Sequence, residues 1–148
     1  MKILKNIVTF GPVGYFFASG TIASLITLPL IYFLSQFNFQ IYLSMFFFLF
    51  ILSYLILKES LKEFHSKDPS EIVIDEFLGC LITFFMIPIN FRSLILGFFL
   101  FRFFDILKPL GLKRIEKIYG ALGILLDDIF AGLISNLILK TIYAIPIN

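Results

Sequence analysis

The sequence predicts an all-α protein, a polytopic membrane helical bundle with about four to five transmembrane or re-entrant helices. Of its 148 residues, 59% are hydrophobic and only 15% are charged, whereas soluble domains are about 45–50% apolar and about 25% charged. No charged side chain occurs between Asn6 and Leu57, a length that accommodates two spans of roughly 20 residues each. With neither an internal repeat nor a linker, residues 1–148 are expected to form a single membrane-embedded domain.

The first apolar segment runs from about Ile7 to Leu34 and is interrupted near its start by Gly11-Pro12. We therefore expect the residues before Thr21 to re-enter the membrane or lie along its surface, with residues 21–34 as the deeper helix. Pro29 is expected to kink that helix. A cleaved signal peptide is disfavoured because the hydrophobicity continues past Ala18-Ser19-Gly20.

Four further apolar segments follow, each separated from the next by a short polar or charged stretch. They are Ile41 to Leu57, Ile72 to Ile89, Ser93 to Leu107 and about Gly120 to Ile145. Asp68-Pro69 precedes the second of these four and predicts a turn that leads into its first helical turn.

Lysine and arginine predict the orientation. With five crossings and the N-terminus inside, most basic residues outside the spans fall on one side: Lys2, Lys5, Lys58, Lys62, Lys67, Lys108, Lys113, Arg114 and Lys117, against Arg92 and Lys140. Because positive loops mark the cytoplasmic side, the side that holds the larger group is expected to face the cytoplasm. The small net charge of +2 gives no indication of nucleic-acid binding.

Acidic residues near the cytoplasmic ends of three predicted helices form the candidate site. The acids are Asp75, Glu76, Asp105, Asp127 and Asp128, with Arg102 at the same depth. Ionisable groups at membrane depth are costly and are usually functional. Carboxylates so close together repel one another unless a cation lies among them, and carboxylate oxygens suit Mg²⁺, or Mn²⁺ as the alternative. The single Cys80 and single His65 exclude zinc sites built from several cysteines or histidines.

Helical spacing supports this arrangement. Arg102 and Asp105 share a face, and Lys108 lies one turn further, where its ammonium could reach a phosphate. Small residues follow the acids on two other faces and would let helices approach closely; these faces are Glu76, Gly79 and Thr83, and Asp128, Gly132 and Ser135.

Simpler interpretations compete with this one. Either acid pair could be a helix cap favoured by the dipole, Arg102 and Asp105 could be a structural ion pair, and the basic loop after Lys108 could only set topology and contact anionic lipid. The cluster as a whole could belong to a small ion or proton pathway or transporter subunit, or to a scaffold subunit. A pathway should place polar groups through the whole membrane depth, whereas these stop on one side.

Four motifs, spread from about Phe10 to Leu139, resemble those of bacterial phosphatidylglycerophosphatase A. They are residues 19–24 (SGTIAS), Asp68-Pro69 with residues 72–79 (IVIDEFLG), residues 101–105 (FRFFD) with Lys108-Pro109, and residues 120–132 (GALGILLDDIFAG). The sequence departs from the family at Ser19, where proline is usual, and at Ala23 and Ala121, where glycine is usual.

The resemblance implies a Mg²⁺-dependent phosphoric monoester hydrolase of the bacterial cytoplasmic (inner) membrane. Its substrate would be phosphatidylglycerophosphate, hydrolysed to phosphatidylglycerol and inorganic phosphate. Carried over by position, the metal would be held by Asp75, Glu76, Asp105, Asp127 and Asp128, with Glu76, Arg102, Asp127 and Asp128 as catalytic residues and Arg102 and Lys108 on the phosphate. We further expect the Gly20-Thr21 turn to offer backbone N–H groups to the phosphate. No traces of cysteine-, histidine- or aspartyl-nucleophile phosphatases are present, so attack by water is favoured.

Overall fold

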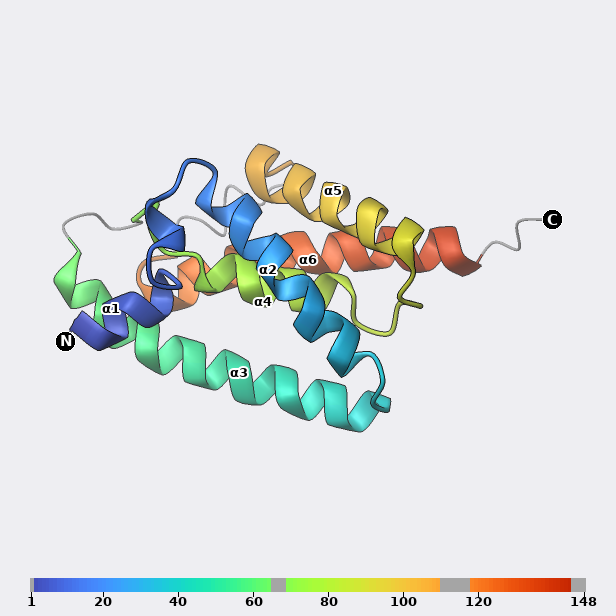
Figure 1. The fold of residues 1–148 in the computed structure, drawn as a ribbon, viewed down its shortest axis with the longest axis horizontal. Coiled ribbons are helices and arrows are strands. Elements are labelled where there is room, and N and C mark those ends of the chain that lie inside the picture. The colour runs from blue at the N-terminus through green and yellow to red at the C-terminus, as the bar shows by residue number, and fades with distance from the viewer. Residues whose placement is uncertain (1, 65–68, 110–117, 145–148) are drawn as a thin grey trace.

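A computed structural model describes residues 2–64, 69–109 and 118–144, and throughout this part of the chain the secondary structure is helical, with no strand (Figure 1). The elements in order are α1 (Lys2–Val8), the 3-10 helix η1 (Val13–Tyr15), α2 (Ser19–Leu34), α3 (Phe39–Ser60), the 3-10 helix η2 (Leu61–Glu63), α4 (Ile74–Thr83), α5 (Phe91–Leu107) and α6 (Ala121–Ala144). The predicted all-α class is confirmed.

Within the described ranges, two helices are long and apolar enough to cross a membrane. One is α3 continued through η2, Phe39–Glu63, and the other is α6, Ala121–Ala144. At about 1.5 Å per residue each is longer than the roughly 30 Å hydrocarbon core. With 16 and 17 residues, α2 and α5 are shorter. The described residues therefore contain two helices of sufficient length, and the predicted number of four to five spans is not confirmed.

The helix of the N-terminal apolar segment is interrupted near Gly11-Pro12, as the sequence predicted. Between α1 and α2 the backbone adopts positive φ at Phe10, Gly11 and Ala18, conformations that no helix interior tolerates. Both α1 and η1 lie at the end of the bundle where α2 begins, and α2 alone runs toward the other end (Figure 1). A continuous helix over residues 21–34, as expected, is therefore present within α2.

The third apolar segment differs from its prediction, because α4 is only 10 residues long. At about 15 Å it spans half a bilayer core. The predicted start at Pro69 is wrong, since the helix begins at Ile74; Asp68 lies outside the described residues.

Two polar side chains complete the buried C-terminal end of α4. The Asn136 side-chain amide of α6 donates to the carbonyls of Thr83 and Phe85, each at 2.9 Å, and the Tyr42 hydroxyl of α3 donates to the Leu81 carbonyl at 2.9 Å. Leu81 and Thr83 lie in the last turn of α4, where carbonyls have no partner within the helix, and Phe85 follows the C-cap. The Asn136 and Tyr42 side chains supply the donors that apolar side chains could not.

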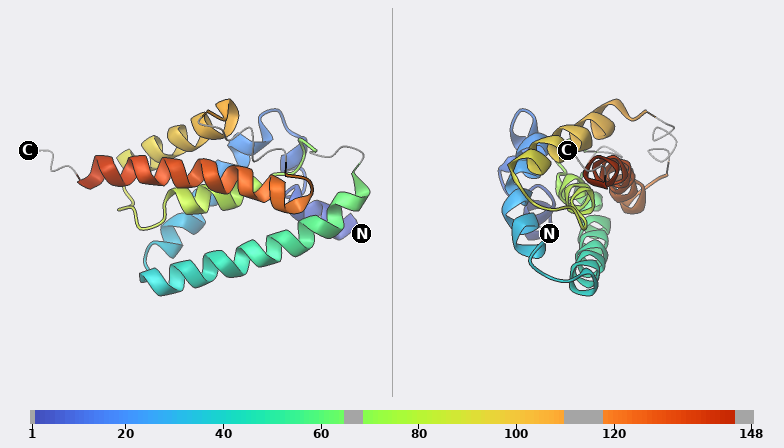
Figure 2. Two further views of the ribbon diagram at one scale, coloured as in Figure 1. Left: turned by 180° about the vertical axis from the view of Figure 1, so that it is seen from behind. Right: turned by 90° about the vertical axis from the view of Figure 1, so that its right-hand side faces the viewer.

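Helix α4 lies at the centre of the bundle and contacts α2, α3, α5 and α6, with its largest contact on α6 (Figure 2). Two glycines permit that contact. A Cβ built at Gly132 of α6 would overlap the Gly79 carbonyl oxygen of α4, and one built at Gly79 would lie 2.6 Å from the Asp128 carbonyl oxygen. The close approach that small residues predicted is confirmed, and it brings the acids of both helices together.

Candidate active site

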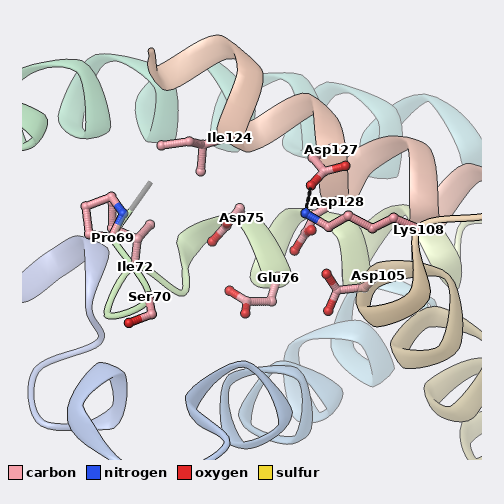
Figure 3. A pocket seen from close by; sticks show the side chains of 10 residues that line it. All are labelled: Pro69, Ser70, Ile72, Asp75, Glu76, Asp105, Lys108, Ile124, Asp127 and Asp128. Atoms are coloured by element: carbon pink, nitrogen blue, oxygen red, sulfur yellow. Dashed lines mark hydrogen bonds and ion pairs between the residues drawn. The ribbon is translucent and has the colours of Figure 1, made fainter. Parts of the chain in front are cut away.

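The acids predicted to converge line one cavity of about 210 Å³. Asp75 and Glu76 come from the first turn of α4, Asp105 from the last turns of α5, and Asp127 and Asp128 from the second turn of α6 (Figure 3). Three helix ends meet here because α4 and α6 begin, and α5 ends, at the same end of the bundle (Figure 1). The predicted convergence is confirmed.

Neither acid pair caps a helix in the simple sense. Asp127 and Asp128 lie beyond the first turn of α6, which contains no acid. Asp75 and Glu76 do lie in the first turn of α4, but Val73 is the N-cap and no side-chain capping bond is present. Capping therefore does not account for the cluster.

Asp75, Glu76 and Asp128 form the part of the cluster best suited to a metal ion. One oxygen from each carboxylate lies within 4.8 Å of the other two. Asp75 Oδ1, Glu76 Oε2 and Asp128 Oδ2 are buried and accept no hydrogen bond. Buried acceptors without a donor are costly, and three carboxylates at this separation repel unless a cation balances them. Hard oxygen ligands of this kind fit Mg²⁺.

The other two acids of the cavity lie in ion pairs. Asp105 accepts from the Arg102 guanidinium one turn earlier on α5, and Asp127 accepts from the Lys108 ammonium. Lys108 reaches α6 because it adopts a left-handed conformation (φ 45°) where it caps α5. The structural ion pair considered for Arg102 and Asp105 thus exists, and it borders the three acids whose geometry suits a metal ion.

Arg102 and Lys108 face different spaces, although the sequence assigned both to one phosphate. Lys108 lines the acid cavity. Arg102 lines a second cavity of about 520 Å³, whose wall includes Glu76 and Ser70, residues that also line the first. Arg102 Nη1 lies 3.9 Å from Glu76 Oε1, so this pair separates the two cavities.

The Gly20-Thr21 turn is only partly brought to the site. Gly20 lines the second cavity, and a Cβ there would overlap the Glu76 carboxylate and lie 2.9 Å from Arg102 Nη1. Thr21 lines neither of these cavities, and its backbone N–H donates to the Ala18 carbonyl at 3.0 Å. The structure therefore places Gly20 against the site and Thr21 outside it.

Sequence reasoning missed Ser70, which lines both cavities and whose carbonyl accepts from the Ser19 hydroxyl at 3.3 Å. Its position directly after Asp68-Pro69, in a motif already singled out, was the available signal. Of the basic loop, Lys113, Arg114 and Lys117 lie outside the described residues, as do Lys67 and His65.

Comparison with known proteins places this arrangement in a family. The model of the family described as Phosphatidylglycerophosphatase A matches residues 6–143. A putative phosphatidylinositol-3-phosphatase of Bacteroides thetaiotaomicron is 41% identical over 76 residues, which are 49% of this chain and 48% of that protein. The phosphatidylglycerophosphatase A of Escherichia coli is 32% identical over 118 residues, 78% of this chain and 69% of the relative.

The phosphatidylglycerophosphatase A of Haemophilus influenzae is 33% identical over 95 residues, 63% of this chain and 58% of the relative. The matched regions thus span between about half and two thirds of these curated relatives. No solved structure matches the chain. The family match covers the four motifs and every acid of the cavity, so this chain belongs to the phosphatidylglycerophosphatase A family.

Proposed function

We propose that this protein is a Mg²⁺-dependent lipid phosphatase that hydrolyses phosphatidylglycerophosphate to phosphatidylglycerol and inorganic phosphate. The observation that carries the proposal is the acid cavity itself, in which Asp75, Glu76 and Asp128 gather their oxygens beside the Lys108 ammonium. Such a cavity offers ligands for a hard divalent cation and a positive charge for the phosphate that the cation accompanies.

Asp75, Glu76 and Asp128 are the residues proposed to hold Mg²⁺, with Asp105 and Asp127 completing the site. When bound, the ion would neutralise phosphate oxygens and stabilise the charge that develops on them in the transition state. Lys108 holds the same phosphate from the α5 side. Asp127 or Asp128, both buried, orients a water for attack on phosphorus and accepts its proton. The bond from phosphorus to the glycerol oxygen breaks, and that oxygen takes up a proton from solvent to give the alcohol.

The proposed membrane placement puts the site end of the bundle in the cytoplasm and the chain across the bilayer several times. Figure 1 shows α1, the end of α3 and the end of α5 at the site end of the bundle; among the described residues these parts carry Lys5, Lys58 with Lys62 directly after it in η2, and Lys108. The start of α5 and the end of α6, which carry Arg92 and Lys140, lie at the other end. This asymmetry supports a cytoplasmic site by the positive-inside rule, and the substrate's acyl chains would stay in the lipid between helices.

A second lipid substrate is suggested by the Bacteroides relative, whose name specifies phosphatidylinositol 3-phosphate. Both lipids carry a phosphomonoester on a polyol that is joined to diacylglycerol through a phosphodiester. The acid cavity recognises the monoester and so fits either, and the assay below therefore includes both.

The alternative of an ion or proton pathway is less well supported. In the described part of the chain the carboxylates of α4, α5 and α6 lie at one end of the bundle, and Leu125, Leu78 and Phe101 are fully buried in its interior. A pathway needs ionisable or hydrated groups along the whole depth.

The test is phosphate release from phosphatidylglycerophosphate and from phosphatidylinositol 3-phosphate in detergent micelles, with Mg²⁺ and with EDTA. We expect Mg²⁺-dependent release from the former that collapses in Asp75→Asn and Asp128→Asn. Glu59→Gln is the matched control, because Glu59 pairs with Lys62 on the exposed surface at 2.6 Å. Absence of release from folded wild-type protein would favour an ion pathway, whereas release that survives both substitutions would place the site elsewhere.

A further inference from the structure

The second cavity shares Ser70 and Glu76 with the acid cavity, and the proposed hydrolysis assigns no role to Arg102 or to residues 14–20 that line it. It is lined by backbone and side chains of residues 14–20, by Ser70 and Glu71, and by Glu76 and Arg102. At about 520 Å³ it is more than twice the size of the acid cavity. It therefore has room for a substantial part of a headgroup beyond the reacting phosphate.

Charge distinguishes the two cavities. The acid cavity holds five carboxylates and Lys108, whereas the second cavity holds Arg102 with Glu71 and Glu76. Among the described residues each cavity thus has one basic side chain, and Glu76, which lines both cavities, lies 3.9 Å from Arg102 Nη1. Guanidinium groups suit phosphate oxygens in particular, since they donate in a planar fork.

The rim of the second cavity carries exposed aromatic side chains. Tyr15, Phe16 and Phe17 line it, and their exposed fractions rise from 57% and 59% to 98%. Tyrosine is enriched at the level of the lipid headgroups, and exposed phenylalanine side chains suit the boundary between headgroups and acyl chains. The acyl chains of a lipid bound here would leave through this rim, away from the acid cavity.

We infer that the second cavity is a subsite for the phosphodiester and glycerol that remain on the lipid product, with Arg102 on the phosphodiester; this inference rests on the proposed function. The reacting monoester lies with Lys108 in the acid cavity, and the glycerol passes beside Glu76. Glu71, partly buried in the same cavity, accepts a hydrogen bond from the glycerol hydroxyl. The site then selects lipids with two phosphates over those with a single phosphomonoester.

Gly20 fits this assignment. A Cβ at this position would overlap the Glu76 carboxylate and lie 2.9 Å from Arg102 Nη1, so there is no space for a side chain. A glycine here leaves Glu76 and Arg102 in the positions that the subsite requires.

Two soluble competitors of lipid hydrolysis test the subsite. Glycerol 3-phosphate carries the phosphomonoester alone, and glycerophosphoglycerol phosphate, the headgroup without acyl chains, adds the phosphodiester. We expect the inhibition constant of the second compound for wild-type protein to be at least about tenfold lower than that of the first, because the phosphodiester adds one charge-assisted contact.

Ser19→Phe fills the subsite without touching the acid cavity, because Ser19 lines only the second cavity of the two. It should bring the two inhibition constants to within about twofold of each other and leave that of glycerol 3-phosphate unchanged. Ser19→Ala, which keeps the space, and Ser44→Phe, the same change on the exposed face of α3, should retain the wild-type preference. Ser19→Leu repeats the test with a smaller side chain if Ser19→Phe does not fold.

Equal inhibition by both competitors in wild type, inhibition by neither, or a preference that persists in folded Ser19→Phe or Ser19→Leu would overturn the subsite. Each of these results is obtained while the lipid itself is being hydrolysed. Failure of the proposed function would show itself differently, as the absence of Mg²⁺-dependent phosphate release from the lipid by wild-type protein. That result would overturn the subsite as well.

Discussion

Gly132 of α6 lies against the backbone of Gly79 in α4, so closely that a Cβ on Gly132 would overlap the Gly79 carbonyl oxygen. Glu76 lies one turn before Gly79, and Asp128 one turn before Gly132. The contact between two glycines therefore sets the separation of the carboxylates proposed to share a metal ion. Packing in the bundle interior and chemistry at its end are coupled through this one crossing.

Gly132→Ala is expected to push α6 away from α4 and to lower both stability and activity. Overpacking of this kind costs about 1–3 kcal/mol, which corresponds to a fall in the unfolding midpoint of several degrees. Thermal unfolding in detergent and the lipid phosphatase assay measure the two effects. Ala144→Val adds methyl groups at the exposed end of the same helix and should change neither; an unaltered Gly132→Ala protein would contradict the role of the crossing.

Gly20→Ala is expected to reduce turnover more than stability. The new methyl group would displace the Glu76 carboxylate or Arg102, and misplacement by about 1 Å near a reacting centre costs on the order of 10²-fold in rate. The kcat for phosphate release and the unfolding midpoint should be measured on the same preparation. A fall in midpoint that accounts for the lost activity would show that Gly20 matters only for folding.

Asn136→Leu should destabilise the protein, because the Thr83 and Phe85 carbonyls would lose the amide that binds them at 2.9 Å. Each buried acceptor left without a donor costs about 1–3 kcal/mol. Tyr42→Phe removes the single bond to Leu81 and should cost less. Tyr32→Phe, at an exposed position, is the control for thermal unfolding, and equal midpoints for Tyr42→Phe and Tyr32→Phe would argue against the capping of α4.

Lys108→Met is expected to lower kcat/KM for the lipid by about 10²-fold, since it removes a charge-assisted contact to phosphate worth roughly 2–3 kcal/mol. Lys108→Arg should retain part of the activity. Lys62→Met is matched in chemistry but breaks only the exposed pair with Glu59, so it should behave as wild type. If Lys108→Met keeps wild-type kcat/KM, then Lys108 does not hold the phosphate.

Asp128→Asn is expected to weaken Mg²⁺ binding and to raise the stability of the metal-free protein. Removing one negative charge from the cluster relieves repulsion, so in EDTA the unfolding midpoint is expected to rise by about 2–4 °C for each kcal/mol gained. The stabilisation that Mg²⁺ gives the wild type should shrink or vanish, because a ligand stabilises only the state that binds it. A midpoint shift on adding Mg²⁺ that equals the wild-type shift would remove Asp128 from the metal site.

The positions of the acids along the chain were enough to predict their meeting, and the reason is topological. When helices alternate in direction, the start of one, the end of the next and the start of the one after lie at the same end. Asp75, Asp105 and Asp127 occupy those places, so their convergence needed only the right number of turns. The break before α2 was equally local, because Gly11-Pro12 disfavours helix wherever it occurs.

The amino-acid sequence by itself thus determined the all-helical class, the apolar segments, the family and the set of acids, all of which follow from composition, periodicity and local motifs. Only the tertiary structure decided that α4 is a half-length helix, because its end depends on Asn136 and Tyr42, which are distant in the chain. Only the tertiary structure separated Arg102 from Lys108 into two cavities, since the direction of a long side chain depends on what packs around it. Helical spacing specifies which residues share a face, but the packing of the neighbouring helices determines which cavity each of those side chains enters.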